Sequence, residues 1–126
     1  YFKLKPLRMD SNQIKAQFKQ ADQHLAAAKS ELNRPAEDVV PFMVCRSTRY
    51  SISHYLQGFL LKHGIEHEED ATVEVLLEKC RAVDPAFSSF DLSAITFKKD
   101  DEYSALFDEM QNCVDLAEYA KQLVSE

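Results

Sequence analysis

Two stretches of the chain repeat apolar residues at alternating gaps of four and three, a spacing that places every member on one face of an α-helix. The first stretch comprises Ile14, Phe18, Ala21, Leu25, Ala28 and Leu32, and the second comprises Leu106, Met110, Cys113, Ala117, Ala120 and Val124. Each stripe covers about five helical turns. Both segments are therefore predicted to be long amphipathic helices that bury one face.

The residues beside these stripes predict where the two helices begin and end. Asp10 or Ser11 is expected to cap the first helix, and Pro35 disfavours the helical conformation at Arg34. The last helix is predicted to begin near Asp100 or Asp101.

The middle of the chain predicts a third long helix and shorter segments. The long helix is expected to begin near Glu37 and Asp38 and to stop at Gly64, because glycine tolerates the left-handed conformation that follows many helices. Asp70 or Thr72 is expected to cap a short helix over "VEVLLEKC". A cap at Asp84 followed by Pro85 predicts one more helical turn. The connection over residues 82–102 carries the apolar anchors Phe87, Phe90, Ile95 and Phe97.

No segment alternates polar and apolar residues for long enough to predict a strand, and only two glycines and four prolines are available to turn the chain. We therefore predict an all-α fold, an antiparallel helical bundle of three long helices and one or two short ones. A length of 126 residues fits one domain. That domain is placed at residues 11–126, and residues 1–10 are expected to be a flexible N-terminal segment or to lie outside the natural chain.

The composition narrows the class of partner. A net charge of −6 disfavours binding to a polyanion by bulk electrostatics, so a nucleic-acid contact would need a local basic patch. No apolar run is long enough for a membrane span, and no membrane association is expected. The three cysteines are an odd number without a Cys-x-x-Cys pair, which favours reduced, buried thiols and a cytoplasmic location.

The stretch "RYSISH" at residues 49–54 contains an Arg-x4-His pair. Metal-independent cleavage of RNA needs a histidine to transfer protons and an arginine to bind the phosphate, so Arg49 and His54 are candidate catalytic residues. Arg46 and Ser53 are candidate phosphate contacts. On an ideal helix, however, His54 points about 140° away from Arg49 but only about 80° away from Arg46. The alternative is that these side chains only stabilise helix packing.

Two further polar clusters contain residue types that bind metals or phosphate. His63 and His67 in "HGIEHEED" have a metal-ligand spacing, but Gly64 is expected to end the helix between them, so no metal site is predicted. Lys98 and Lys99 are candidate phosphate contacts, although the acidic residues after them fit an ordinary helix start. The chain contains no glycine-rich phosphate loop, and no cofactor is predicted.

The order of these segments resembles the HEPN (higher eukaryotes and prokaryotes nucleotide-binding) family over roughly residues 11–124. "YLQGFLLKHGI" is similar to the family's second helix with its glycine stop, and "LLEKCRAVDPAF" is similar to its short third helix with the Asp-Pro turn. The resemblance implies an antiparallel helical bundle that forms a homodimer. Family members include ribonuclease toxins encoded beside a nucleotidyltransferase partner, and also domains that bind nucleotides or proteins without catalysis.

The ribonuclease members of this family carry Arg-x4-6-His in a later helix, at the dimer interface. Here the pair Arg49 and His54 lies on the second helix instead, and no histidine follows His67. The leading hypothesis is therefore a non-catalytic or degenerate HEPN-like domain that binds a nucleotide, RNA or a protein partner as a homodimer, as part of a toxin-antitoxin type pair. The alternatives are an endoribonuclease whose composite site needs two chains, and a helical module that only binds proteins.

Overall fold

The computed structural model describes residues 4–68, 70–95 and 107–125. Within these ranges the chain forms four α-helices, α1 (Leu4–Leu32), α2 (Pro41–Lys62), α3 (Val73–Val83) and α4 (Phe107–Ser125). The short 3-10 helices η1 (Ala36–Asp38), η2 (Pro85–Ser89) and η3 (Leu92–Ile95) lie in the connections, and the described residues include no strand. The predicted all-α class, with three long helices and a short one, is confirmed.

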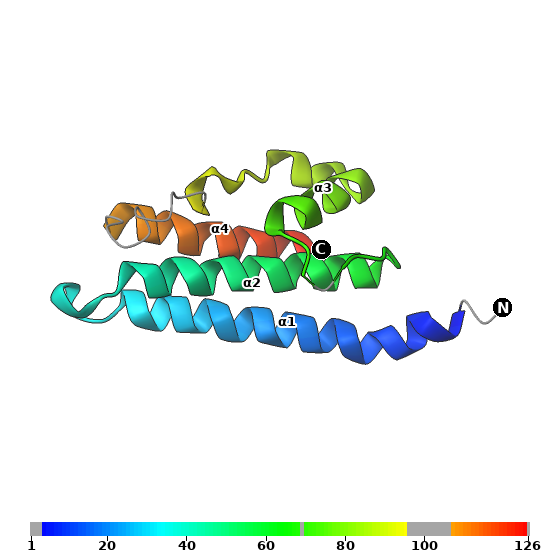
Figure 1. The fold of residues 1–126 in the computed structure, drawn as a ribbon, viewed down its shortest axis with the longest axis horizontal. Helices are drawn as coiled ribbons and strands as arrows, with labels where there is room; N and C mark the ends of the chain where they lie inside the picture. The colour runs from blue at the N-terminus through cyan, green and yellow to red at the C-terminus, as the bar shows by residue number, and fades with distance from the viewer. Residues whose placement is uncertain (1–3, 69, 96–106, 126) are drawn as a thin grey trace.

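The three long helices lie side by side, with α2 between α1 and α4 (Figure 1). α1 and α2 are antiparallel as predicted, but α4 runs in the same direction as α2, so a fully antiparallel bundle was the wrong prediction. The reason is that α3 and the 3-10 helices carry the chain back to the end at which α2 begins. Ion pairs of Lys121 with Asp22 and of Lys29 with Glu118 join α4 to α1 in the matching antiparallel register.

The hydrophobic core lies on both sides of α2, which explains why its sequence is apolar on more than one face. In α1, the stripe residues Ala21, Leu25, Ala28 and Leu32 are buried. In α4, the buried stripe residues are Met110, Cys113, Ala117, Ala120 and Val124. Phe87 and Phe90 of the connection are fully buried and close the core on the α3 side. The two predicted stripes are thus confirmed as core faces.

Gly58, in the interior of α2, packs against the ring of Phe18 of α1. A Cβ atom at this position would lie 2.5 Å from Cε1 and 2.8 Å from Cδ1 of Phe18. These separations are far below the 3.5–4.0 Å of an ordinary carbon contact. Glycine costs roughly 1 kcal/mol relative to alanine in a helix interior, and at this position it makes room for the phenylalanine ring.

Several helix ends match their sequence signals. Gly64 has φ 70°, and its N–H and that of Ile65 donate to the carbonyls of Leu61 and Leu60, which is the Schellman arrangement. Thr72 caps α3 by accepting a hydrogen bond from Val75 N–H at 3.2 Å. At η2, the Asp84 side chain accepts from Ala86 N–H at 2.9 Å.

Two helix starts differ from the prediction. α1 begins at Leu4, before the expected cap at Asp10 or Ser11, because nothing between these positions breaks a helix and Pro6 lies in the first turn, where proline is tolerated. α2 begins at Pro41, since Glu37 and Asp38 belong to the separate turn η1. The predicted start of the last helix, Leu106 and Phe97 lie outside the described residues.

All three cysteines are buried, as predicted. Burial raises the pKa of the Cys80 thiol to about 12. A hydrogen bond with Cys45, together with burial, raises the pKa of the Cys113 thiol. In this fold the Cys80 and Cys113 thiols are therefore protonated packing groups at neutral pH.

Candidate functional site

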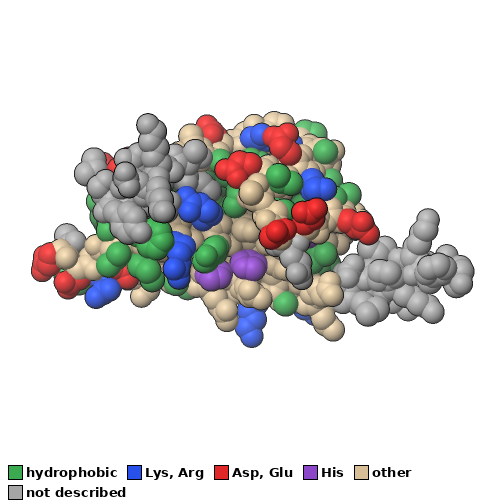
Figure 2. Space-filling model, viewed as in Figure 1, with side chains coloured by type: hydrophobic (Ala, Val, Ile, Leu, Met, Phe, Trp, Pro, Cys, Tyr) green, Lys and Arg blue, Asp and Glu red, His purple; other side chains and the backbone are tan. Residues whose placement is uncertain are grey.

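A row of polar and aromatic side chains follows the edge of α2 that meets α1. Arg46, Tyr50 and His54 are spaced by four residues, so they lie along one side of α2. His24 and Gln17 of α1 face them and are seven residues apart. We call these five residues the polar strip. The face of the molecule drawn in Figure 2 carries histidine side chains that lie side by side, with Lys or Arg and hydrophobic side chains next to them.

The contacts within the polar strip form a continuous chain. The Arg46 guanidinium lies over the Tyr50 ring, 5.7 Å from its centroid. The Tyr50 ring meets the His24 ring edge-on at 5.3 Å, and the His24 ring stacks on that of His54 at 5.5 Å with an angle of 5° between the planes. His54 Nδ1 and Gln17 Oε1 are 2.6 Å apart, so Nδ1 carries the proton and donates to the amide oxygen.

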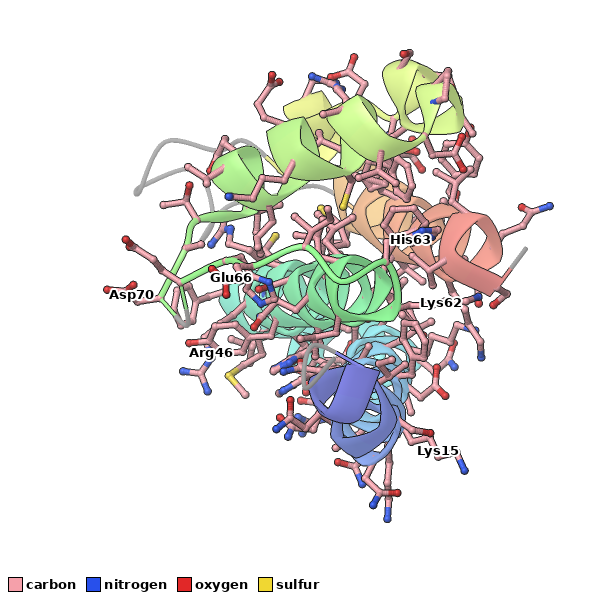
Figure 3. The ribbon with its side chains drawn as sticks, turned by 90° about the vertical axis from the view of Figure 1, so that its right-hand side faces the viewer. Lys15, Arg46, Lys62, His63, Glu66 and Asp70 are labelled. Carbon is pink, nitrogen blue, oxygen red and sulfur yellow. The ribbon has the colours of Figure 1, made fainter. Side chains whose placement is uncertain are left out.

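The solvent exposure of the strip changes along its length. Tyr50 is 46% exposed, and Arg46 is also exposed, whereas His24 and His54 are half-buried. Arg46 points out of the bundle on the same side as Glu66 and Asp70, and Lys62 and His63 lie on the opposite side (Figure 3). The Arg46 end is thus open to solvent and to ligands, while the histidines form a more enclosed end.

Both histidines of the strip are held in the neutral form. Burial, with a smaller effect of the Arg46 charge, lowers the pKa of His24 below its ordinary value of 6.5. Burial, with a smaller effect of His24, lowers the pKa of His54 in the same way. At pH 7 both imidazoles are therefore uncharged, and Arg46 is the only cation among the five strip residues.

Arg49 does not belong to the strip. His54 contacts α1, whereas the Arg49 charge acts on Cys113 of α4, and this separation agrees with the angle expected from helix geometry. Ser53 lies between them and accepts a hydrogen bond from Gln57 Nε2 at 3.0 Å. A single chain therefore does not bring Arg49 and His54 together, and a site that uses both would need a second chain.

The other candidates from the sequence are distributed elsewhere. His63 packs against Phe59 with ring centroids 4.4 Å apart, and the helix ends at Gly64, before His67. Among the described residues, no three potential metal ligands come together. Lys98 and Lys99 lie outside the described residues.

Sequence reasoning missed His24, Tyr50 and Gln17. His24 and Gln17 share a position seven residues apart at the border of the apolar stripe of α1, and that spacing was the available signal. Their role depends on the register between α1 and α2, which a single sequence does not reveal. His54 was a candidate, but its neighbour proved to be a second histidine and not the arginine of "RYSISH".

In the parts of the chain that the structure describes, no helix has the length and apolar character required to cross a bilayer. Comparison with known proteins adds no assignment, since no family model, curated protein or solved structure matches this chain.

Proposed function

We propose that the protein is a HEPN-like helical domain without catalysis of its own, which binds a nucleotide or an RNA segment at the polar strip. The observation that carries this proposal is the Arg46 guanidinium held over the exposed Tyr50 ring. Aromatic faces stack on bases of any sequence, and arginine pairs with phosphate through its planar fork of donors. Arg46 can therefore bind the phosphate of a nucleotide while the adjacent Tyr50 ring stacks on its base.

The net charge of the chain favours RNA binding at one defined site over binding across a broad charged surface. With a net charge of −6, the chain as a whole repels a polyanion, so binding has to come from contacts at a defined place. Phe42 also lies under the guanidinium, with its centroid 5.9 Å from Arg46 Cζ. The two rings restrict the arginine before a ligand arrives, which lowers the entropic cost of binding.

Fluorescence anisotropy with a labelled short RNA tests this proposal. Arg46→Ala is expected to weaken binding and to reduce the salt dependence of log Kd by about one unit, as expected for one lost phosphate contact. Tyr50→Ala is expected to cost about 1 kcal/mol or more, the usual loss for one stacked base. Arg34→Ala is the matched control, because Arg34 is exposed, lies just after the end of α1 and forms an ion pair with Glu31, away from the strip. Equal weakening in all three variants would contradict the proposal.

The second candidate is a metal-independent endoribonuclease. It is favoured only if a second chain brings Arg49 to His54, because within one chain His54 contacts α1 whereas the Arg49 charge acts on Cys113 of α4. Incubation with RNA and EDTA separates the two functions. Cleavage that is lost in His54→Ala would establish the nuclease, and equal absence of cleavage in both proteins would exclude it.

The resemblance extends the proposal to the assembly: a homodimer, a nucleotidyltransferase-type partner and a cytoplasmic toxin-antitoxin type pair. The exposed apolar residues Val40, at the N-cap of α2, and Met43, in its first turn, support a protein contact near the Arg46 end of the strip. Gel filtration over a concentration series tests the homodimer, and a monomer at every concentration would remove it. If RNA does not bind but α2 still captures a protein, the chain is a protein-binding module.

A further inference from the structure

The polar strip continues along α2 into a second feature, a groove at the opposite end from Arg46. A cavity of about 540 Å³ lies between α1, the end of α2 and the segment after Gly64. Gln13 and Gln17 line it from α1, Gln57 and Leu61 from α2, and Glu66 and His67 from the segment that follows. We call it the glutamine groove. Gln17 belongs to both the strip and the groove, so the two features share a wall.

The hydrogen-bonding groups of the groove come from three glutamine side chains, one carboxylate and one imidazole. Gln17 uses its amide oxygen for His54, and Gln57 uses one amide N–H for Ser53. This leaves the amide nitrogen of Gln17 and the amide oxygen of Gln57 without a partner among the described residues. Gln13 is exposed and offers both a donor and an acceptor. The groove therefore offers both donors and acceptors, which the edge of a planar base requires.

Glu66 and His67 add selectivity. A carboxylate only accepts hydrogen bonds, so Glu66 favours a ligand edge that carries an amino group and repels one that carries a carbonyl. His67 Nδ1 is buried and has no hydrogen-bond partner among the described residues, so no partner fixes the tautomer of this ring. None of the six groove residues named above is a lysine or an arginine. The groove therefore offers a phosphate group no lysine or arginine to pair with, in contrast to the Arg46 end of the strip.

The separation of the two features matches a strand and not a single nucleotide. Arg46 and Gln57 are eleven residues apart on α2, which is about 16 Å along the axis with a rotation of only about 20°. At about 3.4 Å per phosphate along a stacked strand, this length corresponds to about five nucleotides. Figure 3 shows Arg46 and Glu66 on the same side of the bundle.

We propose that the glutamine groove selects an amino-bearing base, adenine over uracil, at one end of an RNA strand whose phosphate backbone and another base are held by Arg46 and Tyr50. The inference rests on the proposed function, because the strip supplies most of the affinity. A glutamine amide can form two hydrogen bonds with adenine, one with the amino group of the base and one with its ring nitrogen. A carboxylate accepts a hydrogen bond from the same exocyclic amino group. Uracil places a carbonyl where adenine has the amino group, so it faces Glu66 unfavourably.

The test compares oligoadenylate with oligouridylate of about six nucleotides, a length that covers the strip and the groove, by anisotropy with the unmodified protein, four variants in and around the groove, and Arg46→Ala of the strip. Oligoadenylate is expected to bind about tenfold more tightly, the discrimination of one good base contact. Gln13→Ala and Glu66→Gln are expected to reduce this ratio toward one while affinity for oligouridylate stays constant or rises. The matched controls Gln20→Ala and Glu68→Gln change exposed residues outside the groove and are expected to keep the ratio.

The outcomes separate the two proposals. Equal affinity for both oligonucleotides, with loss of both in Arg46→Ala, would overturn the base selectivity and leave the RNA-binding function standing. If both Gln13→Ala and Glu66→Gln keep the preference for oligoadenylate over oligouridylate, the groove does not recognise the base. Absence of binding to either oligonucleotide would overturn both proposals. Circular dichroism of each variant identifies a loss that arises from unfolding, and Gln13→Ala, at an exposed position, is the variant least subject to it.

Discussion

The contact between Gly58 and Phe18 makes a quantitative prediction about the α1 and α2 interface. Substitution of Gly58 by alanine adds one methyl group in the middle of α2. By helix propensity alone this change stabilises the protein by roughly 1 kcal/mol. The added Cβ would lie 2.5 Å from Phe18 Cε1, however, and an ordinary contact needs at least 3.5 Å. The ring or the helix must therefore move by about 1 Å.

Movements of this kind in a packed interface cost about 1–3 kcal/mol. Phe18 is only half-buried, but its ring also packs against that of Tyr55, with centroids 6.4 Å apart, so the ring is not free to swing away. Gly58→Ala is expected to destabilise the protein by up to about 2 kcal/mol, the difference between the packing cost and the propensity gain. In a Phe18→Ala background the obstacle is absent, and the same change is expected to stabilise by about 1 kcal/mol.

The assay is urea unfolding followed by circular dichroism for the four proteins of this double-mutant cycle. The expected coupling between the two positions is about 1–3 kcal/mol, within the range for residues in contact. If Gly58→Ala stabilises the unmodified protein as much as it stabilises Phe18→Ala, the close approach does not constrain α2 and the reasoning is refuted. Phe18→Ala alone is expected to be destabilising because it removes buried ring surface.

Three further predictions concern the histidines and the helix ends. Because the folded state lowers the pKa of His24 and His54, the unfolded chain binds more protons as the pH falls through 6.5; stability is therefore full above that pH and declines below it. Urea midpoints measured from pH 7.5 to 5.5 should show this decline, and a His24→Gln, His54→Gln variant that declines just as steeply would contradict it. Thr72→Ala removes the cap of α3 and should cost about 1 kcal/mol by urea unfolding, whereas Thr72→Ser should cost much less. Gly64→Ala places a side chain at φ 70° and should lower stability by about 1 kcal/mol, and an unchanged urea midpoint would show that the turn relaxes without cost.

The parts of the fold that depend on neighbours in sequence were predicted well. The stripes of α1 and α4, the stop at Gly64 and the caps at Thr72 and Asp84 follow from spacing and local hydrogen bonding, and all appear in the structure. One local signal, the expected cap at the start of α1, gave the wrong boundary. Asp10 and Ser11 are good caps, but a helix can run through them when no residue stops it.

The parts that depend on distant neighbours were not predictable. The direction of α4 depends on the course of the chain through α3, η2 and η3, and no local pattern specifies that course. His24 was overlooked because only the register of α1 against α2 brings it to His54, and the ring of Phe18 opposite Gly58 helps to fix that register. Helix geometry did predict, from one sequence alone, that Arg49 and His54 point to different sides of α2.

The parallel arrangement of α2 and α4 has a consequence for the order of folding. The connection between α1 and α2 is short, so closing this hairpin has a small entropic cost, whereas α4 reaches its place only after the long excursion through α3. Contacts close in sequence form early in many small proteins, and distant ones form late. Every residue of the polar strip lies on α1 or α2. The proposed binding surface is therefore assembled by the most local contacts of the fold, and α4 supports it from the far side of α2.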